Sequence, residues 1–534
     1  MTSVTASSFS VGIFVPHAVQ NAPYVPYPTC AINGIRNICP LARICCGQGG
    51  VFIKKTPILY NALLLTAVNL LLRFVSTSFQ VFISGRLGAA GVGLLQLVLS
   101  VGSMALTAAS AGIRTASMYL TAAELGRGRK EHIHPIMRAC FTYSMLCSGA
   151  VAVVIWPLAP TIAQMWIGVP DATSAIRLYC CFLPISCLCG VMTGYFTAAG
   201  KIGTLAIVEV VEQLFVMGTT AAMLLYRTGN DSVKACQSVI FGSGIGACVT
   251  LLSLSILHAL EHFPPQKPIF VRKRLLHTAI PLALADDLKV GINTTENLMV
   301  PKRLALYTYC ADPMALFGVV CGMVFPILMF PACIVYSLAD LIIPEMARCN
   351  AAGQPERISL LSKKSLSAVL VYGCFFGGLL FLCAEQLCFS LYNNEDAGFY
   401  LRLYALLAPM LYCDSIIDAI NKGLGQQKIS VRYNILTAFL DVLFLYLLLP
   451  RYGMTGYFFS FLLTHLLNFI LSLRLLLKIA KPRISPLFPI KILTANAVSI
   501  CLGLFISGAW ARSAVFALSY FAILALMGVR KTAL

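Results

Sequence analysis

Long apolar runs separated by short charged or Gly/Pro-rich breaks occupy this chain from about residue 57 to its end. A run of at least about 18 apolar residues is long enough to cross the hydrocarbon core of a bilayer as a helix. The pattern therefore predicts an all-α polytopic membrane protein with about fourteen transmembrane helices. Their expected ranges are 57–84, 91–119, 135–157, 174–199, 203–226, 237–260, 274–298, 315–345, 363–391, 398–422, 429–450, 453–479, 488–509 and 512–529.

Residues 1–50 do not share this pattern, since they contain several prolines but no Lys, Asp or Glu. They lack the charged segment followed by a long apolar run that marks a secretory signal peptide. The membrane pattern begins abruptly at Phe52. We expect this stretch to be a disordered extension, or to precede the true start of translation.

Basic residues gather in alternate loops between the predicted spans, and the intervening loops hold far fewer. Lys and Arg concentrate in loops that stay in the cytoplasm. The alternation therefore predicts that both termini are cytoplasmic, in a multi-pass protein of the bacterial cytoplasmic membrane. The basic loops contain Lys54, Lys55, Arg127, Arg129, Lys130, Lys201, Lys267, Arg272, Lys273, Arg274, Arg348, Arg357, Lys422, Lys428, Arg432, Lys478, Lys481, Arg483, Arg530 and Lys531.

A short sequence echo suggests an internal repeat. Gly85-Arg86-Leu87-Gly88 and Gly102-Ser103-Met104 resemble Lys302-Arg303-Leu304-Ala305 and Gly322-Met323, at offsets of 217 and 220 residues. Parallel repeats with the substrate path between them are common in transporters. We expect an N-terminal half of six helices over 51–272, a second half over 273–481 and two extra helices over 482–534, as in a MATE-like fold.

Composition excludes several classes of protein. Hydrophobic residues make up 59% of the chain, charged residues 11%, and the mean hydropathy is +0.84. A soluble enzyme or a disordered chain would carry more charge. The net charge of +19 is spread over loops, so it does not predict a nucleic-acid partner. The 21 cysteines form no CxxC or Cys/His metal pattern, and no Gly-rich stretch continues into a phosphate-binding Lys-Ser/Thr. We expect no enzyme activity, metal or cofactor.

Polar stripes run along three predicted spans. Asn69, Arg73, Ser76 and Gln80 follow one another at steps of four, three and four residues, and so share one helix face. The second span carries a similar row of hydroxyl residues that ends at Arg114. The span 274–298 carries Asp286, Lys289, Asn293 and Glu296.

A charge in hydrocarbon costs at least about 2.5–3.5 kcal/mol, so these faces must turn toward protein or water. We predict one polar cavity, in which substrate binds Arg73, Arg114, Lys289, Asn69, Gln80, Asn293 and Glu296. Other roles are open. The hydroxyl residues could bind helices together, Arg114 could reach the interface, and Asp286 could simply neutralise Lys289.

A second group of polar residues lies in the spans 398–422 and 429–450, with Asp414, Asp418 and Asn434 at helical spacing. Carboxylate and amide oxygens can hold Na⁺ or carry a proton. Together with Asp286 they are candidates for coupling transport to Na⁺ or H⁺. A neutralised packing cluster is the alternative.

Several stretches resemble the stage V sporulation protein B branch of the multidrug/oligosaccharidyl-lipid/polysaccharide (MOP) exporter superfamily, which includes lipid II flippases. They are Asn69–Arg73, Gly85–Gln96, Ala111–Arg114, Pro281–Leu284, Glu296–Pro301, Gly322–Pro326 and Ile343–Glu345.

The resemblance implies a flippase, working as a monomer among membrane lipids, that moves a polyprenyl-diphosphate-linked sugar by alternating access. Arg73, Arg114 and Lys289 would bind the diphosphate. Asp286, Asp414, Asp418 and Asn434 would hold the coupling cation. The Lys at position 289, next to two Asp residues, departs from the family's arginine pattern. A drug/cation antiporter of the same fold and a non-transport membrane scaffold for cell-wall or spore assembly are the alternatives.

Overall fold

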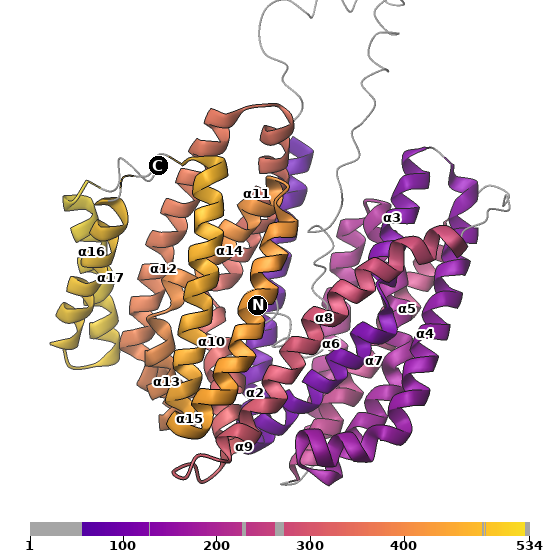
Figure 1. Ribbon diagram of the computed structural model, residues 1–534, viewed down its shortest axis with the longest axis horizontal. Helices are drawn as coiled ribbons and strands as arrows, with labels where there is room; N and C mark the ends of the chain where they lie inside the picture. Colours follow the sequence, from indigo (N-terminus) through magenta and orange to yellow (C-terminus); the bar gives the residue numbers. More distant parts are fainter. Residues whose placement is uncertain are drawn as a thin grey trace, which may run out of the picture.

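The computed structural model describes residues 56–127, 129–226, 231–261, 272–482, 485 and 487–528. Nearly all of these residues are helical and none of them is in a β-strand. The predicted extension 1–50 lies outside the described residues. Figure 1 shows two groups of helices that meet near one end and diverge toward the other.

In Figure 1 the first part of α2 lies beside α11, among the helices of the other group. The N-terminal half of the chain comprises α2 (Thr56–Ser110), α3 (Ile113–Gly126), α4 (Ile133–Thr161), α5 (Thr173–Ala198), α6 (Ile202–Tyr226) and α7 (Ser232–Ala259). Three short segments complete it: η4 (Lys130–His132), the π-helical η5 (Ile162–Ile167) and η6 (Pro170–Ala172).

The rest of the chain is also helical wherever a span is predicted. Its elements are α8 (Arg272–Leu304), α9 (Pro313–Phe317), the π-helical η7 (Gly318–Val324), α10 (Phe325–Met329), α11 (Ala332–Ala351), α12 (Pro355–Tyr392), α13 (Glu395–Ala405), α14 (Ala408–Gly423), α15 (Gln427–Ala480), α16 (Leu487–Leu504) and α17 (Ala509–Leu526). The last two pack on the outer side of α12 (Figure 1).

Two helices each contain two predicted spans. The 55-residue α2 and the 54-residue α15 would each be about 80 Å long if straight, far more than the roughly 30 Å of hydrocarbon. Each changes direction at a glycine instead of a loop. Gly88 has φ 68° and Gly453 has φ 57°, a region of backbone space that favours glycine.

The number of membrane crossings depends on how these helices are divided. Among the described residues, eight helices are long and apolar enough to cross a membrane, or up to ten if each of two bent pairs is one span. Helices α2 and α3 together count as one of the eight, and so does α15, although each of these stretches contains two predicted spans. Helix α8 is not among the eight, because charged residues occur along it. The predicted total of fourteen is therefore not confirmed, although each predicted span coincides with helix.

Three of the predicted spans, 91–119, 315–345 and 398–422, are wrong as continuous helices. The first is interrupted at Ala111 and Gly112, between α2 and α3, where both residues have positive φ. Helices α10 and α11 meet at 60°, at Phe330 and Pro331, and α13 and α14 meet at 54°, just before Pro409. Proline lacks the backbone N–H of a helix interior and its ring clashes with the preceding turn. Pro331 therefore accounts for the bend between α10 and α11.

Glycines bring the two halves into close contact where they meet. A Cβ atom on Gly318 of η7 would lie 2.0 Å from the carbonyl oxygen of Ala89 and 2.7 Å from the backbone nitrogen of Gly93, both in α2. A Cβ on Gly93 would lie 2.3 Å from the carbonyl oxygen of Met314. Only hydrogen at these positions lets the two backbones touch.

We expect Gly318→Ala to lower the thermal unfolding temperature of the purified protein. The added methyl meets backbone on both sides, and such overpacking costs about 1–3 kcal/mol. Gly291→Ala in α8 is the control, because no atom lies within 4 Å of its added Cβ. Equal stability of the Gly318→Ala variant and the parent protein would contradict this role of the contact.

Candidate functional site

Arg73 lies where the first part of α2 contacts α11. Its half-buried guanidinium is 5.7 Å from the ring centroid of Tyr336, and the neighbouring Phe74 ring is 6.0 Å from that of Phe330. Tyr336 in turn lies near Ser415 on α14 and within electrostatic range of Asp414. A cation of the first half is thus placed on an aromatic ring of the second.

One face of α14 carries most of the polar partners. Asp414, Asp418 and Lys422 follow at steps of four residues, and Lys422 Nζ lies 2.8 Å from Asp418 Oδ2. Lys289 of α8 interacts electrostatically with Asp418, with Lys422 and with Asp286 of its own helix. The α14 face therefore lies within electrostatic range of Lys289 and is linked to Arg73 through Tyr336.

Asp414 is a buried member of this face, with 2% of its surface exposed. Its Oδ2 accepts a hydrogen bond of 3.0 Å from Asn468 Nδ2 on α15, and its Oδ1 has no hydrogen-bond partner. The sequence reasoning missed Asn468. A signal was present, because Ser460, Thr464, Asn468 and Ser472 recur every four residues within an apolar stretch.

Three predicted substrate ligands are packed inside the protein in this conformation. Gln80, Asn293 and Glu296 are only 3%, 7% and 4% exposed. Neither amide atom of Gln80 has a hydrogen-bond partner, and neither does Oε1 of Glu296. Glu296 is close enough to Asp441 of α15 for an electrostatic interaction, and Asp441 Oδ1 accepts hydrogen bonds from Ser460 (2.6 Å) and Thr464 (3.3 Å).

Arg114 belongs to a different environment. It is half-buried near the start of α3 and lies within electrostatic range of Glu209 on α6. Glu209 and Glu212 line a cavity of about 100 Å³ inside the first half, between α2, α5, α6 and α7. Thr250 donates a 2.6 Å hydrogen bond to Glu212. Arg114 is therefore placed with carboxylates of its own half.

The remaining predicted residues are scattered. Asp286 is exposed, and Asn434 is half-buried on α15, where its carbonyl accepts a bond from Thr437. The side chain of Asn69 lies outside the described residues. The hydroxyl stripe of α2 bonds to its own helix, as in the 2.8 Å bond from Ser100 to the carbonyl of Gln96. Within the described chain no group of three His, Cys, Asp or Glu residues is arranged to hold a metal ion.

A family model supplies the identification. The MatE model matches residues 66–220 and 309–447, which together make up more than half of the chain. The chain belongs to the MatE family. The two matched segments lie one in each predicted half, although the boundaries of those halves remain a prediction.

Curated relatives agree with the resemblance seen in the sequence. The chain is 21% identical over 420 residues to stage V sporulation protein B of Bacillus subtilis (strain 168), covering 75% of this chain and 79% of the relative. It is 26% identical over 230 residues to sporulation protein YkvU of the same organism, covering 41% and 51%.

Solved structures show the fold of this MatE-family protein. It superposes on the lipid II flippase MurJ in an inward closed conformation with a TM-score of 0.65 and 10% identity, over 87% of this chain and 98% of that one. It superposes on an inward-facing multidrug resistance MATE family transporter of the MOP superfamily with a TM-score of 0.64 and 14% identity, over 78% and 98%. The predicted MATE-like, multi-pass membrane fold is confirmed.

The difference in exposure between Asp286 and Gln80 can be tested by cysteine labelling. In a background without reactive native cysteines, Asp286→Cys should react with a water-soluble maleimide, because this position is exposed. Gln80→Cys should react far more slowly, since Gln80 is buried. Labelling rates measured by mass shift on the purified protein check this. Rapid labelling at both positions would mean that the Gln80 face is open to water.

Proposed function

We propose that this MatE-family protein is a flippase that moves a polyprenyl-diphosphate-linked sugar across the bacterial cytoplasmic membrane by alternating access of its two halves. The observation that supports this most is the position of Arg73, half-buried in a membrane helix and facing the other half through Tyr336. Arginine suits a diphosphate because its guanidinium donates two parallel hydrogen bonds. Lys289 would add a second cation from α8.

The polar face of α14 suits a coupling cation in this scheme. Asp414 and Asp418 supply carboxylate oxygens one turn apart, and Asn468 holds one oxygen of Asp414 in place. Such oxygens bind Na⁺ or carry H⁺. Asp286 would act through Lys289, and Asn434 would contribute from α15. Both termini would lie in the cytoplasm, with the protein acting as a monomer among its lipids.

The rival function is a drug/cation antiporter, and the fold does not separate the two. The TM-scores against the flippase and the multidrug transporter are 0.65 and 0.64. The chemistry of Arg73 does separate them, because an intramembrane cation favours an anionic substrate and repels a cationic drug. A scaffold for cell-wall or spore assembly would need neither Arg73 nor movement.

Complementation tests the proposal directly. Expression in a strain depleted of its lipid II flippase should restore growth, and protein in liposomes should flip a fluorescent polyprenyl-diphosphate-linked sugar. Resistance to cationic dyes without either effect would favour the antiporter. Absence of both transport activities would favour the scaffold.

Substitution of Arg73 tests the residue that we assign to the diphosphate. We expect Arg73→Ala to lower flipping roughly ten- to a hundredfold, because a hydrogen bond to a charged group contributes about 1.5–3 kcal/mol. Arg73→Lys should restore part of the activity, since it keeps the charge but loses the bidentate geometry. Initial flipping rates in liposomes are the measurement.

Arg86→Ala is the matched control for this experiment. Arg86 also lies on α2 with its guanidinium over an aromatic ring, 5.9 Å from the centroid of Phe82, but it is exposed beyond the stripe. Its loss should leave flipping near the parent rate. Full activity of Arg73→Ala would show that Arg73 is structural.

A further inference from the structure

The connection between the two halves starts on the first half. Glu261, which follows α7, is held there by two contacts. Its Oε1 lies 2.7 Å from Lys201 Nζ, between α5 and α6, and its Oε2 accepts a 2.7 Å hydrogen bond from Tyr195 of α5. The chain is thus fastened to the first half at the point where it leaves α7.

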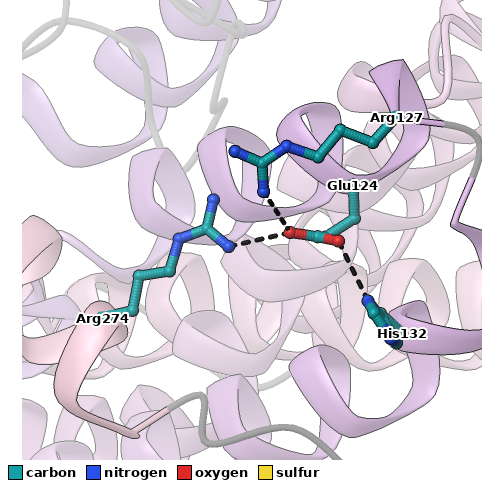
Figure 2. Close-up of polar contacts among 4 residues, drawn as sticks. All are labelled: Glu124, Arg127, His132 and Arg274. Atoms are coloured by element: carbon teal, nitrogen blue, oxygen red, sulfur yellow. Dashed lines mark hydrogen bonds and ion pairs between the residues drawn. The ribbon is translucent and has the colours of Figure 1, made fainter. Parts of the chain in front are cut away.

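The same connection also ends on the first half. Arg274, in the first turn of α8, places Nη1 2.8 Å from Glu124 Oε1 at the end of α3. The same oxygen lies 3.0 Å from Arg127 Nη1, and Glu124 Oε2 lies 3.0 Å from His132 Nδ1 (Figure 2). One buried carboxylate, its side chain only 3% exposed, thus gathers three basic side chains from α8, the end of α3 and η4.

A second acid in the chain has a related set of partners. Glu345 of α11 contacts Arg348 at the same three-residue spacing as Glu124 and Arg127, and it contacts Arg357 in the first turn of the next helix. The two glutamates are 221 residues apart, close to the offsets of the predicted repeat. Each therefore joins the end of its helix to the start of the next one.

Glu124 differs from Glu345 in two respects. It has an additional partner, Arg274, which lies 150 residues away on the helix that begins the other half. Its side chain is also far less exposed, at 3% against 27%. Burial strengthens the ion pairs through reduced screening, and removing this one acid would leave three basic groups facing each other.

The far end of α8 is fastened to the second half. The guanidinium of Arg303 lies 3.2 Å from the ring centroid of Tyr446 on α15. In Figure 1, α8 runs from the neighbourhood of α3 to α9, across the region where the two groups of helices meet. Its two ends are therefore attached to different halves.

We propose that Glu124 is a latch that fastens the first turns of α8 to the N-terminal half, so that α8 itself links the two halves mechanically. Arg274 is the residue through which α8 is held, and Arg127 and His132 keep the Glu124 carboxylate in place. The latch matters for transport only because the two halves move against each other in the proposed function, on which this inference rests. Its existence can be tested without any substrate.

Distances between spin labels test the latch in the full chain in lipid nanodiscs. One label pair, at Arg138→Cys on α4 and Ile280→Cys on α8, reports the separation of α8 from the first half, since both positions are exposed. The parent protein should give one narrow distance distribution. Glu124→Gln should broaden it and shift it to longer distances, because the charge that holds Arg274 is lost.

Two further variants keep the test decisive. Arg274→Gln removes only the link to α8 and should reproduce the broadening, even if Glu124→Gln fails to fold. Glu345→Gln, the matched control, removes a carboxylate with two arginine partners from the other half and should leave the label distance unchanged. A distribution as narrow as the parent's in both latch variants, or equal broadening in the control, would overturn the proposal.

These results are independent of the transport assays. Broadening with loss of the latch, in a protein that flips no lipid-linked sugar, would retain the latch and reject the proposed function. Flipping by a protein whose label distance is unchanged in Glu124→Gln would retain the proposed function and reject the latch.

Discussion

The cost of a charge inside hydrocarbon governs the arrangement of this protein. An unpartnered ion there costs several kcal/mol, so each intramembrane charge must find protein or water. Arg73 lies over Tyr336, Lys289 lies within electrostatic range of Asp418 and Asp286, and Arg114 interacts with Glu209. The helices of both halves are positioned so that these contacts can form.

Close packing at one end supports the contacts between the halves. Gly93 and Gly318 allow the backbones of α2 and η7 to touch, which a side chain on either residue would prevent. The nearby helices α2 and α8 are also hydrogen-bonded, since Thr294 and Asn297 donate to the backbone carbonyl and the hydroxyl of Ser100. The two halves are thus joined firmly at this end and diverge beyond it (Figure 1).

The ion pairs at the opposite end follow a different principle. Glu124 and Glu261 hold the two ends of the connection between the halves on the first half. The start of α8 therefore belongs to the second half by sequence but contacts the first half. The sequence assigns α8 to the second half from residue 273 onward. The contacts of Arg274 attach its first turn to the first half, while those of Arg303 attach its last turn to the second.

The sequence alone determines the helices and their polar faces. Apolar runs locate the helices, and the steps between Asn69, Arg73 and Gln80 assign them to one face, because both patterns depend only on local helix geometry. The breaks at Gly88, Pro331 and Gly453 also follow from local backbone chemistry.

Only the tertiary structure decides which helix each face meets. Arg114 and Arg73 appear equivalent in sequence, yet one interacts with Glu209 and the other with Tyr336. Asn468 becomes a partner of Asp414, and Arg274 reaches Glu124 across 150 residues. The physical reason is that helical periodicity fixes the direction in which a side chain leaves its helix. The partner that it meets depends on how distant helices pack, and glycine contacts and buried charges together determine that packing.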